Sequence, residues 1–178
     1  HTTPPAPQIT IRNRWSGRTI FQGGETIADA VRLSRESGAD LRGANLSDAD
    51  LRCADLSDAN LRCADLSGAN LSPIRDDIWV ILSSAPAEAA AVRDALAAGR
   101  VDGSTYSGAC SCLVGTIATA RGCDVDTLVR NSARPAERFF MAIRPGHTPD
   151  NSQHCALAHQ WVSEWVDRMR AAFGTAQP

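Results

Sequence analysis

Long apolar runs are missing from this 178-residue sequence, although apolar residues make up 43% of it. A membrane-spanning helix needs about eighteen or more consecutive apolar residues, and no stretch approaches that length. The first residues, His1 to Pro7, also lack the basic end and the apolar stretch of a secretion signal. We therefore expect a protein of the cytoplasm that makes no membrane contact.

A strong excess of charge is missing as well. The 18 basic residues, all of them arginine, stand against 20 acidic residues, and the formal net charge is −2. Binding to nucleic acid or to anionic lipid calls for a basic surface, which this composition does not supply. Nucleic acid is therefore not an expected partner.

Paired Cys-x2–4-Cys spacings, which are usual in structural zinc sites, are also missing. The sequence has six cysteines and no export signal, and Cys53 and Cys63 are ten residues apart in equivalent surroundings. A chain of this kind usually keeps its cysteines reduced. We expect free thiols, and we expect neither a metal nor another cofactor.

What the sequence does contain is an internal repeat of five residues between Ala39 and Pro73. Each of its seven units reads Ala, then Asp or Asn, then Leu, then two residues that are mostly small or polar. The central leucines are Leu41, Leu46, Leu51, Leu56, Leu61, Leu66 and Leu71.

A period of five fits neither regular element. Around an α-helix, successive leucines would be turned by about 140° and would spread over all sides, and in a flat strand they would alternate between the two faces. A chain that turns a corner every five residues can instead direct every leucine, with the preceding alanine, inward. The polar residues of each unit then face outward.

This pattern resembles the pentapeptide-repeat family. The resemblance implies a right-handed quadrilateral β-helix in which four units make one coil, so that Leu41 lies under Leu61 and Leu46 under Leu66. Burying a leucine contributes roughly 1.5–3 kcal/mol, whereas ordering one residue costs about 1.5 kcal/mol. Fewer than two coils therefore need a cap at each end.

The flanking segments supply the expected caps and a further domain. Residues 9–21 read as a β-hairpin, and Thr26 begins a helix that Gly38 ends. After Ser72-Pro73, apolar periodicity predicts helices over 74–82, 86–98, 107–121, 135–143 and 151–173. The expected fold class is α+β, divided into residues 1–38 (arm, hairpin and capping helix), 39–73 (repeats) and 74–178 (α-helical domain).

The helical part contains the residues that suggest chemistry. A cysteine near a helix N-terminus is acidified by the helix dipole, and a distant histidine could act as its base. The candidates for such a catalytic site are Cys110, Cys112, His147, His154 and His159. A zinc site would combine Cys110, Cys112 and Cys123 with one of His147, His154, Cys155 or His159. Buried, inert thiols are the alternative.

The repeats carry the candidate binding residues, which are Arg42, Arg52, Arg62, Asp48 and Asp58. The spacing of ten residues predicts that Arg42 and Arg62 share one side of the coil and that Arg52 lies on the opposite side. Aspartate alternates with asparagine at the second position of the units, so we expect these side chains to accept hydrogen bonds from nearby backbone amides or to face water.

The first functional hypothesis is a non-enzymatic protein-binding or scaffolding protein, of which a phage or mobile-element regulator or inhibitor of a host protein is one form. Its partner is another protein, and a homodimer is a further expectation that does not exclude such a partner. The second hypothesis is an enzyme with a Cys/His site in the helical domain and repeats for docking. The third is a DNA mimic that binds topoisomerases, although six Asp and three Arg give the repeats a charge of only −3.

Overall fold

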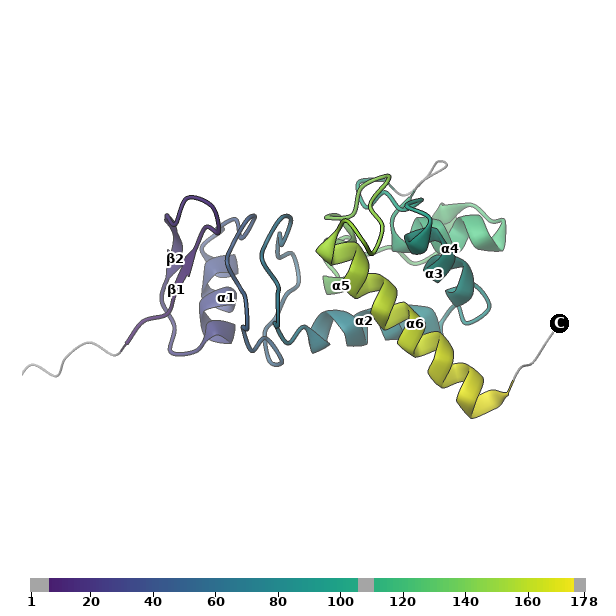
Figure 1. Ribbon diagram of the computed structural model, residues 1–178, viewed down its shortest axis with the longest axis horizontal. Helices are drawn as coiled ribbons and strands as arrows, with labels where there is room; N and C mark the ends of the chain where they lie inside the picture. Colours follow the sequence, from purple (N-terminus) through teal and green to yellow (C-terminus); the bar gives the residue numbers. More distant parts are fainter. Residues whose placement is uncertain (1–6, 106–110, 175–178) are drawn as a thin grey trace, which may run out of the picture. The chain divides into compact units, whose positions relative to one another are not determined.

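The computed structural model describes residues 7–105 and 111–174. The chain divides into two compact units, His1–Ile74 and Arg75–Pro178 (Figure 1). The first unit contains a β-hairpin, one helix and the repeats, and the second is helical. The fold class is mixed α+β, as predicted. Within the described residues, no helix is both long enough and apolar enough to cross a membrane.

The first unit begins with the predicted hairpin. Strand β1 (Thr10–Arg12) pairs antiparallel with β2 (Thr19–Gln22), and a bulge lies between Ile11 and Arg12. The turn is closed by the Asn13 N–H, which donates to the Arg18 carbonyl at 2.8 Å. Gly17, at φ +67°, supplies the left-handed residue that this turn requires. Ile11 points into the core and is buried.

Helix α1 (Ile27–Glu36) follows the hairpin. Thr26 caps it as predicted, because its hydroxyl accepts a hydrogen bond from the Asp29 N–H at 3.1 Å. Ala30, Val31 and Ser34 form the buried face. Figure 1 shows the hairpin and α1 at one end of the repeats.

In the repeats, backbone segments twenty residues apart lie side by side. Parallel bridges join Asn45 to Asp65 and Asp50 to Asn70. The Asp65 N–H donates to the Ala44 carbonyl at 2.8 Å, and the Asp65 carbonyl accepts from the Leu46 N–H at 2.9 Å. The seven central leucines are all buried, with at most 3% of their surface exposed. Each unit therefore buries its central leucine, and units that are four apart in the sequence lie side by side.

A tight turn closes each of the first six units. The N–H of the next alanine donates to the carbonyl of the central leucine at 3.0–3.2 Å. The last residue of the unit has positive φ at Gly43, Asp48, Asp58, Cys63 and Gly68. An i to i+3 bond with positive φ at the third turn residue defines a type II turn. Turns of this kind close five of the first six units, and the turn at Cys53 keeps the same hydrogen bond without positive φ.

The second unit continues helix α2 (Ser72–Ser83), whose first residues belong to the first unit. It also contains α3 (Ala89–Ala97), α4 (Leu113–Arg121), the 3₁₀ helix η1 (Val125–Thr127), α5 (Pro135–Phe140) and α6 (Gln153–Phe173). Helix α3 packs against α4 and α6, and α5 packs against the same two helices. Phe139 and Phe140 are fully buried at the centre.

Three helix predictions need correction. A helix was expected from Ser107, but residues 106–110 lie outside the described residues, and α4 begins only at Leu113. Ser111 instead forms a parallel bridge with Val101, and the Cys112 N–H donates to the Thr105 carbonyl at 2.7 Å. These hydrogen bonds hold Ser111 and Cys112 in an extended conformation, so the helix begins only after them. Ser72, expected as a cap, is the first residue of α2.

Helix α5 ends at Phe140 and not at Ile143 as predicted, because the Ala142 and Ile143 amides make i to i−3 bonds and tighten the chain into a turn. The Ile143 carbonyl then accepts from the Gly103 N–H at 3.0 Å. On α6, the predicted apolar stripe is buried only as far as Val166, and Phe173 is exposed.

Candidate binding surface

The polar side chain at the second position of each unit forms the corner. Its Oδ1 atom accepts a hydrogen bond from the backbone N–H two residues later, at 3.0–3.3 Å. This confirms the role expected for these side chains. Asp and Asn both supply such an oxygen, which explains why they alternate without changing the backbone. The seven residues are Asp40, Asn45, Asp50, Asp55, Asn60, Asp65 and Asn70.

The hydrogen bonds from the following serines and arginine lower the pKa of three of these aspartates. For Asp55 the main cause is the Ser57 N–H, and for Asp65 it is the Ser67 hydroxyl. For Asp50 it is the Arg52 guanidinium, which holds both carboxylate oxygens. The aspartates therefore stay ionised on the outer surface of the repeats.

The three arginines of the repeats occupy different units. The Gly43 N–H donates to the Arg62 carbonyl at 2.9 Å, which places the first unit, with Arg42, beside the fifth. Arg52 belongs to the third unit, which pairs with the seventh through Asp50 and Asn70. Arg42 and Arg52 are exposed, and Arg62 is half-buried.

Asp40, Asp50, Asp55 and Asp65 each have an arginine partner. Arg42 and Arg52 pair within their own units with Asp40 and Asp50. Two further partners come from the capping elements, since Arg35 at the end of α1 reaches Asp55 at 2.9 Å and Arg14 on the hairpin lies 4.0 Å from Asp65. These two pairs, which join residues twenty and fifty-one positions apart, could not be predicted from the local sequence pattern.

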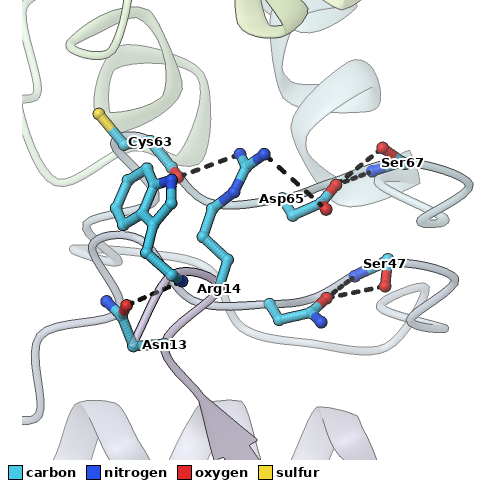
Figure 2. A network of polar contacts seen from close by, with 8 residues as sticks. Asn13, Arg14, Ser47, Cys63, Asp65 and Ser67 are labelled. Atoms are coloured by element: carbon cyan, nitrogen blue, oxygen red, sulfur yellow. Dashed lines mark hydrogen bonds and ion pairs between the residues drawn. The ribbon is translucent and has the colours of Figure 1, made fainter. Parts of the chain in front are cut away.

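Arg14 attaches the hairpin to the stacked units (Figure 2). Its guanidinium donates to the Cys63 carbonyl at 3.5 Å and approaches Asp65, while its backbone N–H donates to the Gly43 carbonyl at 2.8 Å. The Asn45 N–H also donates to the Arg12 carbonyl at 2.8 Å. The hairpin therefore covers the backbone edge of the first two units.

Trp15 is the large exposed side chain beside this attachment. It is 67% exposed, and the Arg14 guanidinium lies 5.3 Å from its ring centroid. The ring leaves no room for a side chain at Gly43, because a Cβ there would lie 2.6 Å from it. Tryptophan and arginine are the residues most enriched at the centres of protein interfaces.

Asp48 and Asp58 are exposed at the unit corners, each with positive φ. Asp48 lies over Gly68 twenty residues later, and its N–H donates to the Ser67 carbonyl at 2.7 Å. Asp58 lines a shallow groove of about 240 Å³, together with Arg35, Asp40 and Asn60. These two aspartates therefore lie at separate corners of the repeats.

The structure gives the Cys/His candidates of the second unit separate surroundings. Cys112 precedes α4 as its N-cap, but burial and the nearby Glu137 carboxyl raise the pKa of its thiol to about 12. The expected acidification by the helix dipole is therefore outweighed. The Glu137 side chain, which the sequence pattern did not indicate, is buried, with 3% of its surface exposed. Cys110 lies outside the described residues.

The three histidine candidates lie in different surroundings. His147 accepts from the Arg144 N–H at 3.1 Å, and the buried His154 ring packs 4.9 Å from Phe139. His159 is half-buried on α6. Cys155 donates to the Leu96 and His147 carbonyls, and burial raises the pKa of its thiol to about 11. Across residues 7–105 and 111–174, no three His, Cys, Asp or Glu side chains form a metal-binding group.

Comparison with protein families identifies the repeats. Residues 37–72 match the family described as Pentapeptide repeats, in eight copies. This confirms the resemblance drawn from the seven units that begin at Ala39. The match covers the repeats alone. Comparisons with curated proteins and with solved structures gave no match.

Proposed function

We propose that the repeats form a short right-handed four-sided β-helix and that the chain is a non-enzymatic protein-binding or scaffolding protein. The observation that carries this proposal is the separation of roles within each unit. The leucine is buried, most of the alanines before it are buried as well, the Asp or Asn oxygen holds the corner, and the fourth residue of each unit is exposed or half-buried outside a buried leucine. Such a surface offers regularly spaced contacts to a partner.

The contact surface we propose combines the wall of Arg42 and Arg62 with the neighbouring Trp15 and Arg14. The Gly43 and Cys63 corners join these residues, since Trp15 packs on Gly43 and Arg14 bonds to the Cys63 carbonyl. An exposed tryptophan held beside an arginine supplies apolar area and directed hydrogen bonds with little loss of side-chain freedom. Asp48 and Asp58 are the proposed acidic contacts at the corners.

Charge pairing in the repeats argues against DNA mimicry as the mechanism. A DNA mimic needs a continuous acidic surface, whereas Arg14, Arg35, Arg42 and Arg52 each pair with an aspartate of the repeats. These ion pairs interrupt the acidic surface of the repeats, whose net charge is −3. A partner that recognises alternating charge and one aromatic group fits this surface better.

The test compares variants of opposite walls. The double variant R42S/R62S changes the proposed surface, and Arg52→Ser is the matched control on a different wall. Proteins captured from host lysate by the wild type should be lost with R42S/R62S and with Trp15→Ala but retained with Arg52→Ser. Capture that is equal for all four proteins would contradict the proposed surface.

Self-association is the alternative form of binding that the same samples test. Light scattering at several concentrations should show about 38 kDa, twice the 18.9 kDa of the chain, if two copies pair. A mass of 18.9 kDa at every concentration, together with no protein whose capture depends on Trp15, would leave the binding function without support.

A further inference from the structure

The second unit contains a pocket that the proposed function does not use. It has a volume of about 270 Å³ and lies between the end of α2, helix α4, the segment after η1 and helix α5. Ile81, Val114, Ile117 and Leu128 contribute apolar walls. Ligand pockets for drug-sized molecules usually measure 300–1,000 Å³, so this pocket suits a smaller ligand with an apolar body.

Glu137 is the buried polar group of this pocket. It lines the pocket and also a second cavity of about 130 Å³ beside Gly103 and Ser104. Its Oε1 atom is buried and has no hydrogen-bond partner. Leaving a buried polar atom without a partner costs roughly 1–3 kcal/mol, so an unpartnered oxygen on a residue that lines two cavities favours a ligand group at this place.

The surroundings of Glu137 indicate which kind of group is missing. Burial raises the pKa of this carboxyl, which favours the protonated form, although the Cys112 thiol and the Val114 N–H partly oppose the shift. Both of these groups are donors, so they occupy an acceptor oxygen. When the carboxyl is protonated, the unpartnered Oε1 is the oxygen left to carry the proton, and an O–H there needs an acceptor.

Two arginines line the same pocket and also favour an acceptor. Arg134 is oriented by Asp77, which its Nε contacts at 3.0 Å, and Arg121 is oriented by Glu88 at 2.8 Å. Neither Asp77 nor Glu88 lines the pocket, whereas both arginines do. A cationic ligand would therefore meet two positive groups, and an anionic one would be attracted.

We infer that this pocket binds a small apolar carboxylate, whose oxygens accept from Glu137 and lie close to Arg134 and Arg121 while its apolar body contacts Ile117 and Leu128. Two sources offer this chemistry. One is a free organic acid, and the other is the C-terminal residue of a peptide, whose carboxylate and apolar side chain form the same group.

The experiment uses the full chain and matched probes. 3-Phenylpropanoate carries the proposed group, 3-phenylpropylamine reverses its charge, and Gly-Gly-Phe presents the same group at a peptide C-terminus, with its C-terminal amide as control. Binding is followed by protein NMR at ligand concentrations up to about 5 mM, which detects Kd values near 1 mM. Shifts should appear on residues around the pocket with the acid and not with the amine.

Three variants assign the binding to the pocket. Leu128→Ala keeps Glu137 and removes part of an apolar wall, and it should weaken binding about tenfold. Glu137→Gln keeps a neutral group that can donate, so it should bind the acid near neutral pH. Glu164→Gln makes the same chemical change on α6, outside the pocket, and should change nothing.

The pH profile supplies a readout that a merely structural Glu137 would not move. As the pH rises through the Glu137 pKa, the carboxylate that forms repels the ligand, and wild-type affinity falls. Among residues 7–105 and 111–174, the charged or titratable groups that act on Glu137 or line its two cavities include Cys112, Asp77, Arg134, Arg121 and Arg138. All of them remain in the Glu137→Gln variant, whose affinity should stay constant over the same pH range.

Each outcome decides the inference. Binding of the free acid supports a small-molecule site, and binding of Gly-Gly-Phe alone, without its amide, supports capture of a peptide C-terminus. Preference for the amine, or acid binding that Leu128→Ala leaves unchanged, overturns the inference. So does the absence of shifts with both carboxylates.

Discussion

Asp65 bonds to both neighbours of Asn45, donating to the Ala44 carbonyl at 2.8 Å and accepting from the Leu46 N–H at 2.9 Å. Two backbone segments twenty residues apart are held in register by this pair of bonds. The register places the side chain of Leu46 inward and that of Ser47 outward. A single step along the chain therefore separates a position that determines stability from one that does not.

The variant Leu46→Asp should unfold the repeats, because burying an unpaired carboxylate costs several kcal/mol against a total stability of about 5–15 kcal/mol. Ser47→Asp adds the same side chain at the next position, which is exposed, and should change the stability by less than about 1 kcal/mol. Circular dichroism melts of both variants measure the difference. Similar melting temperatures for the two would contradict the burial of one leucine per unit.

The cysteines at equivalent corners should respond in opposite ways to glycine. Cys63 has φ +58°, which costs a non-glycine residue about 1–2 kcal/mol, whereas the φ of Cys53 is not positive. Glycine also adds about 0.5–1 kcal/mol of unfolded-state entropy at either position. Cys63→Gly should therefore raise the free energy of unfolding by about 0.5 kcal/mol.

Cys53→Gly should lower the free energy of unfolding by about 0.5–1 kcal/mol, since it relieves no backbone strain. Denaturant unfolding of the two variants gives both values. Because both side chains are exposed, loss of packing does not obscure the comparison. A loss of stability in Cys63→Gly as large as in Cys53→Gly would show that the two corners have the same conformation.

Glu137 should make the second unit less stable as the pH rises. Its pKa in the folded chain is raised above the usual value of 4.5, so the folded state binds the proton more tightly than the unfolded state does. The resulting stabilisation is complete below pH 4.5 and is lost as the pH rises through the folded pKa. Glu137→Gln removes this dependence.

Urea denaturation of the wild type and of Glu137→Gln at a series of pH values measures this effect. The difference in free energy of unfolding, variant minus wild type, should increase with pH from 4.5 upward. The control variant Glu164→Gln should follow the wild type throughout. A difference that is constant with pH would mean that the pKa of Glu137 is the same in the folded and unfolded chains.

The thiols should differ widely in reactivity. Cys53 and Cys63 are exposed, whereas Cys112 and Cys155 are buried and have pKa values raised to about 12 and about 11. Because only the thiolate is alkylated, a short pulse of iodoacetamide near pH 8 should modify the first pair and leave the second pair intact. Mass spectrometry of the peptides reads out each site. Rapid modification of Cys112 would restore it as a candidate nucleophile.

Those parts of the fold that depend on local pattern could be predicted from the sequence. The period of five indicated the buried leucines, and the exchange of Asp and Asn indicated that their shared oxygen holds the corner. Thr26 could be read as a cap because capping involves residues only three apart. In each case the information lies within a few neighbouring residues.

The remaining features depend on contacts between distant residues. Arg14 and Arg35 resemble ordinary surface arginines in the sequence, and only the folded chain brings them to Asp65 and Asp55. Glu137 lies in the first turn of a short helix, where an acidic residue is common, so its position gave no reason to expect burial. The burial of Cys112 beside Glu137 could not be predicted either, because it depends on a contact between distant residues.

Because of the corner hydrogen bond, the charge on the surface of the repeats can change while their fold stays the same. Asp and Asn hold a corner through the same oxygen, so exchanging them changes the charge of a wall without moving the backbone. Replacing the four corner aspartates by asparagine would take the repeats from −3 to +1, and replacing the three corner asparagines by aspartate would take them to −6. Single exchanges of Asp and Asn can therefore change which partners this surface attracts. Each exchange changes the charge by one unit and leaves the stability of the fold nearly unchanged.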